Sequence, residues 1–333
     1  MIETQQPTIW GVGIVFSIVA ILSVTLRFQA RRIMASKLES DDWTILLALI
    51  LGIGVTIDVL IMTQHGGLGT HSRYDDDGNI LDVEAMITFN KTIYALGIIT
   101  WPALGMTKIS VLLMYKRIFA TPRFGIIAWI LVGVIAAWAI AFTFAMALSC
   151  TPIESQWFFD LPHSPSTCVN VVALFITALA TDVATDSLVL LLPIYKIRKL
   201  QMPFARKVMI ACIFLLGSLV SFMGLIRIYY STKIYHCLED SFKPDVTWNY
   251  SATCYWTIIE VNVGVLSACL PTLRPVQECA TQNLSRLRRS ATHLFSSFGK
   301  KTKDLRSSRT ESLNLVRIES SRTSEQSRVL RHL

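Results

Sequence analysis

Long runs of apolar residues alternate with short polar connectors along this chain, and seven of the runs are long enough to cross a membrane. About 20 helical residues, at a rise of about 1.5 Å each, cross the hydrocarbon core of a bilayer. Runs of this length predict an all-α polytopic membrane protein with a bundle of seven transmembrane helices. The expected spans are residues 9–28, 43–64, 92–115, 124–148, 171–195, 208–230 and 251–270.

The third apolar run, residues 91–119, contains a lysine and a proline. Lys108 at this depth costs roughly 2.5 kcal/mol or more unless it faces a partner or water, and Pro102 is expected to interrupt the helix. Either Lys108 extends to the cytoplasmic surface, about two turns away, or other spans supply carboxylates. Asp182 and Asp186, four residues apart, would share one helix face. The acids in other spans are Asp58, Asp182, Asp186 and Glu260.

Depth in the bilayer indicates which of these charges meet. The expected pairs are Lys108 with Asp186 or Glu260, and Arg227 with Asp58. Four acids against two bases leave some carboxylates protonated, hydrated, or bound to a cation or ligand. Such a polar core is typical of a receptor pocket, an ion site or a transport path; the alternative is a network that only locks helix packing. The predicted intramembrane network comprises Lys108, Asp58, Asp182, Asp186, Arg227, Glu260 and Asn262.

The composition supports the membrane interpretation and places the basic charge. Of 333 residues, 52% are hydrophobic and 16% are charged, whereas soluble domains have about 25% charged residues. The net charge of +8 arises after residue 273, where 13 basic residues face 5 acidic ones. It therefore describes a tail and not a nucleic-acid-binding domain. The expected organisation is a membrane domain (1–275), an amphipathic juxtamembrane helix (276–299) and a disordered basic Ser/Arg-rich cytoplasmic tail (300–333).

The connector charges predict the orientation. No Lys or Arg precedes Arg27, so the first run is interpreted as a span and not as a signal peptide. One set of connectors is much richer in basic residues than the other, and the positive-inside rule then places the N-terminus outside and the C-terminus in the cytosol. The basic residues of the richer set are Arg31, Arg32, Lys37, Lys116, Arg117, Arg123, Lys196, Arg198, Lys199, Arg206 and Lys207.

Four cysteines lie in or beside the expected outer loops. Cys150 and Cys168 flank one loop, whereas Cys237 lies within another and Cys254 at the outer end of the seventh span. The two disulfides Cys150–Cys168 and Cys237–Cys254 are expected in an oxidising compartment, although four cysteines allow three pairings and free thiols remain an alternative.

Two glycosylation sequons and a histidine-containing loop complete the outer side. Asn90 and Asn249 begin sequons close to expected spans. The segment HGGLGTH, from His65 to His71, precedes an aspartate cluster. Its spacing fits no standard metal site, and Arg73 occupies the position of the first calcium-loop aspartate, so we expect a solvated loop without a metal.

A set of motifs recurs through the expected spans and connectors, at residues 26–43, 67–71, 107–119, 150–157, 185–207, 224–230 and 259–276. In their order and spacing these stretches resemble the fungal rhodopsin-domain integral membrane proteins, the group that includes the satratoxin-cluster membrane protein and receptor-like proteins. The resemblance implies a seven-helix protein of fungal membranes, and some members are encoded in secondary-metabolite gene clusters.

The same resemblance does not extend to retinal chemistry. A retinal protein needs a lysine in its last span for a Schiff base, and residues 251–270 contain none. We therefore expect no cofactor. The third span ends in YKRIF, which departs from the Asp-Arg-Tyr type motif of common G-protein-coupled receptors.

The favoured function is a receptor-like or accessory membrane protein, not an enzyme, that binds a small molecule in its polar core. The alternatives are a proton-coupled transporter or exporter of a metabolite, and a membrane terpene cyclase that uses buried carboxylates. Expected partners are the bilayer, anionic inner-leaflet lipids that attract the basic tail, an unidentified small molecule and a cytosolic signalling protein. The expected location is the plasma membrane or an endomembrane.

Overall fold

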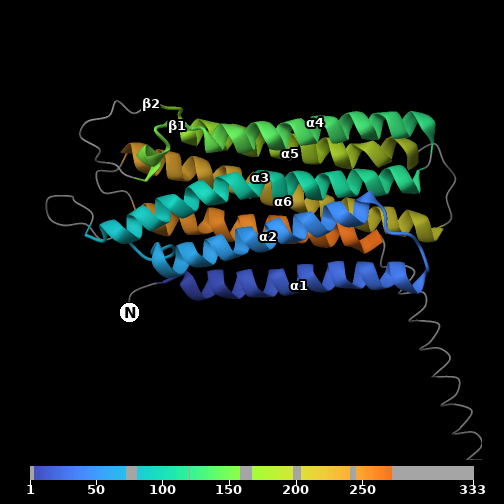
Figure 1. Cartoon of the computed structure of the whole chain (residues 1–333), viewed down its shortest axis with the longest axis horizontal. Helices are drawn as coiled ribbons and strands as arrows, with labels where there is room; N and C mark the ends of the chain where they lie inside the picture. Colours follow the sequence, from blue (N-terminus) through green and yellow to red (C-terminus); the bar gives the residue numbers. More distant parts are fainter. Residues whose placement is uncertain are drawn as a thin grey trace, which may run out of the picture. The chain divides into compact units, whose positions relative to one another are not determined.

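The structure is a computed structural model, and it describes residues 4–72, 81–119, 121–157, 167–197, 204–240 and 245–271. Seven helices in these residues are long and apolar enough to cross a membrane, which confirms the prediction of an all-α bundle. The helices run side by side along one direction (Figure 1). They are α1 (Gln6–Ile33), α2 (Ser40–His65), α3 (Val83–Ile118), α4 (Pro122–Ala147), α5 (Val171–Ile197), α6 (Phe204–Asp240) and a seventh helix, Val246–Pro271.

The bundle has two ends, named here by their chemistry. The basic end is where α1 and α3 finish and α2 and α4 begin. The disulfide end carries the N-terminus and the strands β1 (Cys150–Thr151) and β2 (Thr167–Cys168) (Figure 1).

Helix α3 and the seventh helix are the central members of the bundle. In their most apolar windows 72% of residues are buried, against 28% for α1 and α4. The outer helices instead expose large apolar side chains such as Ile18, Ile130 and Phe144. Those surfaces suit contact with lipid tails, and charged residues are left to the helix ends and the core.

Helix α3 continues past Pro102, so the expected interruption is wrong. Its close approach to α4 depends on two glycines. A Cβ at Gly97 would lie 2.5 Å from Cε of Met146, and one at Gly105 would lie 2.8 Å from Cβ of Ala139. Small residues let membrane helices approach this closely, and van der Waals packing then holds them.

Helices α5 and α6 meet in the same way. A Cβ at Gly217 would lie 2.3 Å from Cδ2 of Leu190, and one at Gly224 would lie 2.7 Å from Cγ2 of Val183. Gly224 also faces the seventh helix, because its Cβ would be 3.2 Å from Oε1 of Glu260. This contact brings α6 against the carboxylates of the core.

The disulfide between Cys150 and Cys168 is present and joins the antiparallel strands β1 and β2. The second expected disulfide is wrong, because Cys254 is a free thiol. Cys254 points into the core, fully buried, with its Sγ 3.9 Å from Sδ of Met62. The side chain of Cys237 lies outside the described residues.

The segment after α2 packs into the bundle and is not the solvated loop that we expected. Leu68 is fully buried, and Gly69 accepts a hydrogen bond from the Gln5 backbone and donates one to Thr247. Gly69 has a φ of 80°, a conformation that favours glycine. Nδ1 of His71 forms a hydrogen bond with Oδ2 of Asp245. The loop thus ties α1 and α2 to the start of the seventh helix.

The structure does not test the predictions for the sequons and for the C-terminal segments. Asn90 and Asn249 lie within α3 and the seventh helix, half-buried, and glycosylation remains a prediction. The amphipathic helix (276–299) and the tail (300–333) lie outside the described residues, as do Asp75, Asp76 and Asp77.

Candidate functional site

Lys108 is buried in the bundle and bound to α5, which excludes the alternative that it extends to the surface. It is 6% exposed, and its Nζ contacts four oxygens of α5. Two belong to Asp182, the backbone oxygen at 2.9 Å and Oδ1 at 2.8 Å. The others are Oγ1 of Thr185 at 2.8 Å and Oδ1 of Asp186 at 3.0 Å. The expected contact with Asp186 is present, and Asp182 adds a second that depth had not indicated.

Arg227 forms its ion pair with Glu260 of the seventh helix, so the expected pair with Asp58 is wrong. Both partners are at most 1% exposed. Equal depth was a poor guide because α6 packs on α5, whereas Asp58 belongs to α2, which packs on α1 and α3. Oδ2 of Asp58 is buried without a hydrogen-bond partner.

The two ion pairs belong to one group of charges, which we call the core cluster: Lys108, Asp182, Asp186, Arg227 and Glu260. One carboxylate oxygen from each acid lies within 4.8 Å of the other two. With all five side chains ionised, three negative charges face two positive ones. Burying charges is costly unless each is compensated, so in this ionisation state the cluster would carry one uncompensated negative charge in the middle of the bundle.

The core cluster is bordered by aromatic and hydroxyl groups. The ring of Trp138 lies 5.1 Å from Nζ of Lys108, within the range of a cation–π interaction. Its Nε1 donates to Oγ1 of Thr181 at 2.9 Å. The side chain of Asn262 binds its own helix, because its Nδ2 donates a hydrogen bond to the backbone oxygen of Ile258. The structure therefore brings together five of the seven predicted network residues and leaves Asp58 and Asn262 outside the group.

A cavity of about 50 Å³ adjoins the cluster on the side of the basic end. Lys108 and Asp186 contribute its polar wall, and Tyr115, Val189 and Gly217 are among the other lining residues. A water molecule occupies about 10–15 Å³ on this measure. The cavity therefore has room for a few waters or a very small polar group in this conformation.

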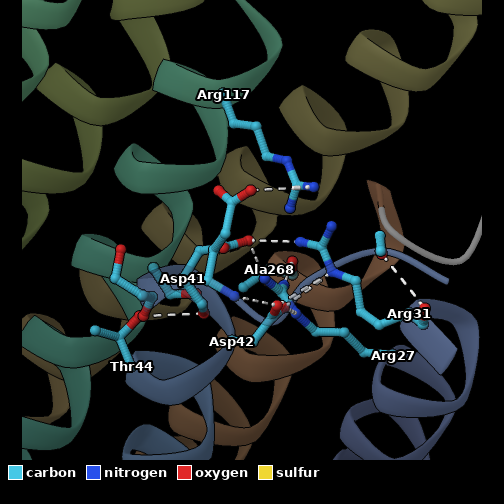
Figure 2. Close-up of polar contacts among 11 residues, drawn as sticks. Arg27, Arg31, Asp41, Asp42, Thr44, Arg117 and Ala268 are labelled. Atoms are coloured by element: carbon cyan, nitrogen blue, oxygen red, sulfur yellow. Dashed lines mark hydrogen bonds and ion pairs between the residues drawn. The ribbon is translucent and has the colours of Figure 1, made fainter.

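A second buried group of charges, which the sequence reasoning missed, lies at the basic end and is drawn in Figure 2. Arg27 donates from Nε to Oδ1 of Asp42 at 2.8 Å and from Nη2 to Oδ2 of Asp41 at 2.6 Å. Arg31 reaches the same two carboxylates at 2.9 and 3.2 Å. The remaining Arg27 contact is to the backbone oxygen of Ala268 in the seventh helix, at 2.8 Å. We call Arg27, Arg31, Asp41 and Asp42 the end cluster.

The end cluster is electrically neutral and ties several helices together. Ser110 of α3 donates to the backbone oxygen of Asp41, and Arg117 of α3 pairs with Glu39 at 3.3 Å. The sequence predicts Arg31 as a connector charge, but it is buried near the end of α1. The sequence does contain one indication of this cluster: Arg27 and Arg31 are four residues apart and therefore share a helix face.

The sequence of this chain was compared with protein families, with characterised proteins and with solved structures. The family model of the fungal rhodopsin domain matches residues 26–278. The polyenoic acids biosynthesis gene cluster protein Ba17b of Metarhizium anisopliae is 27% identical over 79% of this chain and 72% of its own length. The phomoidride biosynthesis cluster protein H of a fungal species is 27% identical over 82% and 89%. The satratoxin biosynthesis SC1 cluster protein 4 of Stachybotrys chartarum is 26% identical over 51% and 58%. No solved structure matches the chain.

Proposed function

The chain belongs to the fungal rhodopsin domain family, and we propose on that basis that it is a receptor-like accessory membrane protein of secondary metabolism. The context is supported by relatives that are themselves named as biosynthesis cluster proteins. In this proposal the N-terminus is outside, the basic end faces the cytosol, and the protein resides in the plasma membrane or an endomembrane. A small polar molecule acts on the core cluster and requires no enzymatic step.

The observation that carries the proposal is the set of contacts of Lys108. One side chain of α3 holds α5 through two carboxylates and a backbone oxygen, while Arg227 joins α6 to the seventh helix through Glu260 beside it. Four helices thus meet at charges that are buried and unequally compensated. A group that changes these contacts would change how the four helices pack.

The proposed mechanism follows from the cavity. A polar ligand that enters on the Asp186 side competes for Lys108 and weakens its hold on α5. The ligand shifts the equilibrium only by its difference in affinity for the two arrangements. The resulting movement is expected at the basic end of α3, α5 and α6, where a cytosolic partner would detect it.

A second function, proton-coupled export of a metabolite, is favoured by one observation. The core cluster contains one more carboxylate than it has basic partners, and such groups in membrane spans often mark proton pathways. Loss of export on collapse of the proton gradient would favour this alternative over the receptor role. A deletion strain that exports normally would remove it.

The test of the receptor role compares Lys108 variants in the native host. Lys108→Ala removes the contacts, and Lys108→Arg keeps the charge but changes its shape, so both should alter the transcripts of neighbouring biosynthetic genes and their metabolite. Lys233→Ala, at an exposed position of α6 toward the disulfide end, is the control. Membrane delivery is followed with a fluorescent tag. Variants of Lys108 that reach the membrane and behave as wild type would rule out the mechanism.

A further inference from the structure

Each acid of the core cluster divides its two oxygens in the same way. Lys108 contacts Oδ1 of Asp182 and Oδ1 of Asp186, and Arg227 contacts Oε2 of Glu260. The second oxygens are Oδ2 of Asp182, Oδ2 of Asp186 and Oε1 of Glu260, and all three are buried without a hydrogen-bond partner. Buried acceptors without partners are costly, so three of them at one place indicate that something else binds there.

The spacing of the acids suits a metal ion. One oxygen from each of Asp182, Asp186 and Glu260 lies within 4.8 Å of the others. Oxygen ligands contact a hard cation at about 2.3–2.6 Å. Three carboxylates this close can therefore contact one ion with small rotations of their side chains. The adjoining cavity, lined by Lys108 and Asp186, has room for water molecules that would complete the coordination.

The charge balance selects the kind of ion. The three acids exceed Lys108 and Arg227 by one negative charge. A monovalent ion neutralises the group, whereas a divalent ion would leave a positive charge buried beside two basic side chains. A proton would also balance the charge, but a shared proton joins two oxygens and leaves the third without a partner.

We propose that Asp182, Asp186 and Glu260 form a binding site for one monovalent metal cation, with Na⁺ as the first ion to test. Lys108 and Arg227 are not ligands; they orient the carboxylates by holding one oxygen of each. This inference goes beyond the receptor role, because cation binding is a property of the purified protein whatever its ligand or partner.

The experiment uses the full chain purified in detergent, with NaCl replaced stepwise by choline chloride at constant ionic strength. We expect the apparent Tm of the wild type to rise with Na⁺ and to saturate, and equilibrium dialysis with ²²Na⁺ to give about one ion per chain. Asp182→Asn and Glu260→Gln should each abolish the Na⁺-dependent rise. Asp58→Asn, a buried acid outside the cluster, should keep it.

Three results would overturn the proposal. One is a Tm that is the same in NaCl and choline chloride, with no bound ²²Na⁺ in the wild type. Another is a stabilisation that follows pH alone, which would assign the site to a proton. The third is a loss of the Na⁺ response in Asp58→Asn as complete as in Asp182→Asn. The dialysis measurement on wild type keeps the test valid where a variant does not fold, and none of these results depends on the receptor role.

Discussion

The ammonium of Lys108 binds Asp182 twice, through the carboxylate at 2.8 Å and through the backbone oxygen of the same residue at 2.9 Å. That backbone oxygen also accepts a hydrogen bond from Thr185. Lys108 is therefore attached to the α5 backbone as well as to a side chain. A rotation of Asp182 alone would not release α3 from α5.

Removing Lys108 should destabilise the protein strongly. Lys108→Met leaves three buried acids with only Arg227, and breaking a buried ion pair typically costs about 3–5 kcal/mol. Adding Asp182→Asn to this variant removes one of the repelling charges, so the double variant should recover part of the loss. Thermal unfolding in detergent measures both effects, with Lys233→Met, at an exposed position of α6, as control. A double variant that is no more stable than Lys108→Met would contradict this electrostatic account.

Removing a buried arginine from the end cluster should also destabilise the protein, and an exposed arginine on the same helix provides the control. Arg27 is fully buried and contacts two carboxylates and a backbone oxygen, whereas Arg32 on the same helix is exposed. Arg27→Ala should therefore lower the free energy of unfolding by about 3–5 kcal/mol. Arg32→Ala should change it by no more than about 0.5 kcal/mol. Equal effects in the two variants, measured by denaturant or heat, would show that the end cluster is not a structural centre.

The seven helices could be predicted from the sequence because each apolar run is as long as a membrane is thick. The need of Lys108 for carboxylates was also predictable, since a lone lysine at that depth is too costly. Helical spacing placed Asp182 and Asp186 on one face. These inferences use distance along a single helix, which a sequence contains directly.

The partner of Arg227 could not be predicted in this way. Membrane depth supplies one coordinate of a residue, but not the rotation of its helix or the identity of the neighbouring helices. Depth favoured Asp58 for Arg227 and Glu260 only for Lys108, whereas the packing of α6 pairs Arg227 with Glu260. The end cluster was missed for a related reason, because Arg31 close to a helix end resembles a connector charge until its burial is known.

The disulfide predicts a simple pattern among cysteine variants. Cys150→Ser, Cys168→Ser and the double variant should lose the same stability, about 3 kcal/mol for a loop of 15–20 residues, because each removes the same bond. Cys254 is free, so Cys237 should react with a maleimide in the unreduced, denatured protein as Cys254 does. If both thiols react only after a reductant is added, then Cys237 and Cys254 form a disulfide, and the structure is contradicted.

The contact between α3 and α4 can be tested with two glycines that differ only in their surroundings. A Cβ at Gly105 would lie 2.8 Å from Cβ of Ala139, an atom that moves only with its backbone, whereas one at Gly133 of α4 meets nothing within 4 Å. Gly105→Ala should therefore force the helices apart and cost about 1–3 kcal/mol. Gly133→Ala should be neutral or gain up to about 1 kcal/mol, because alanine suits a helix better than glycine. Unfolding measurements on both variants check the difference. A Gly105→Ala protein as stable as Gly133→Ala would mean that α3 and α4 are not in direct backbone contact at this level, and the packing that positions Lys108 would need to be reassigned.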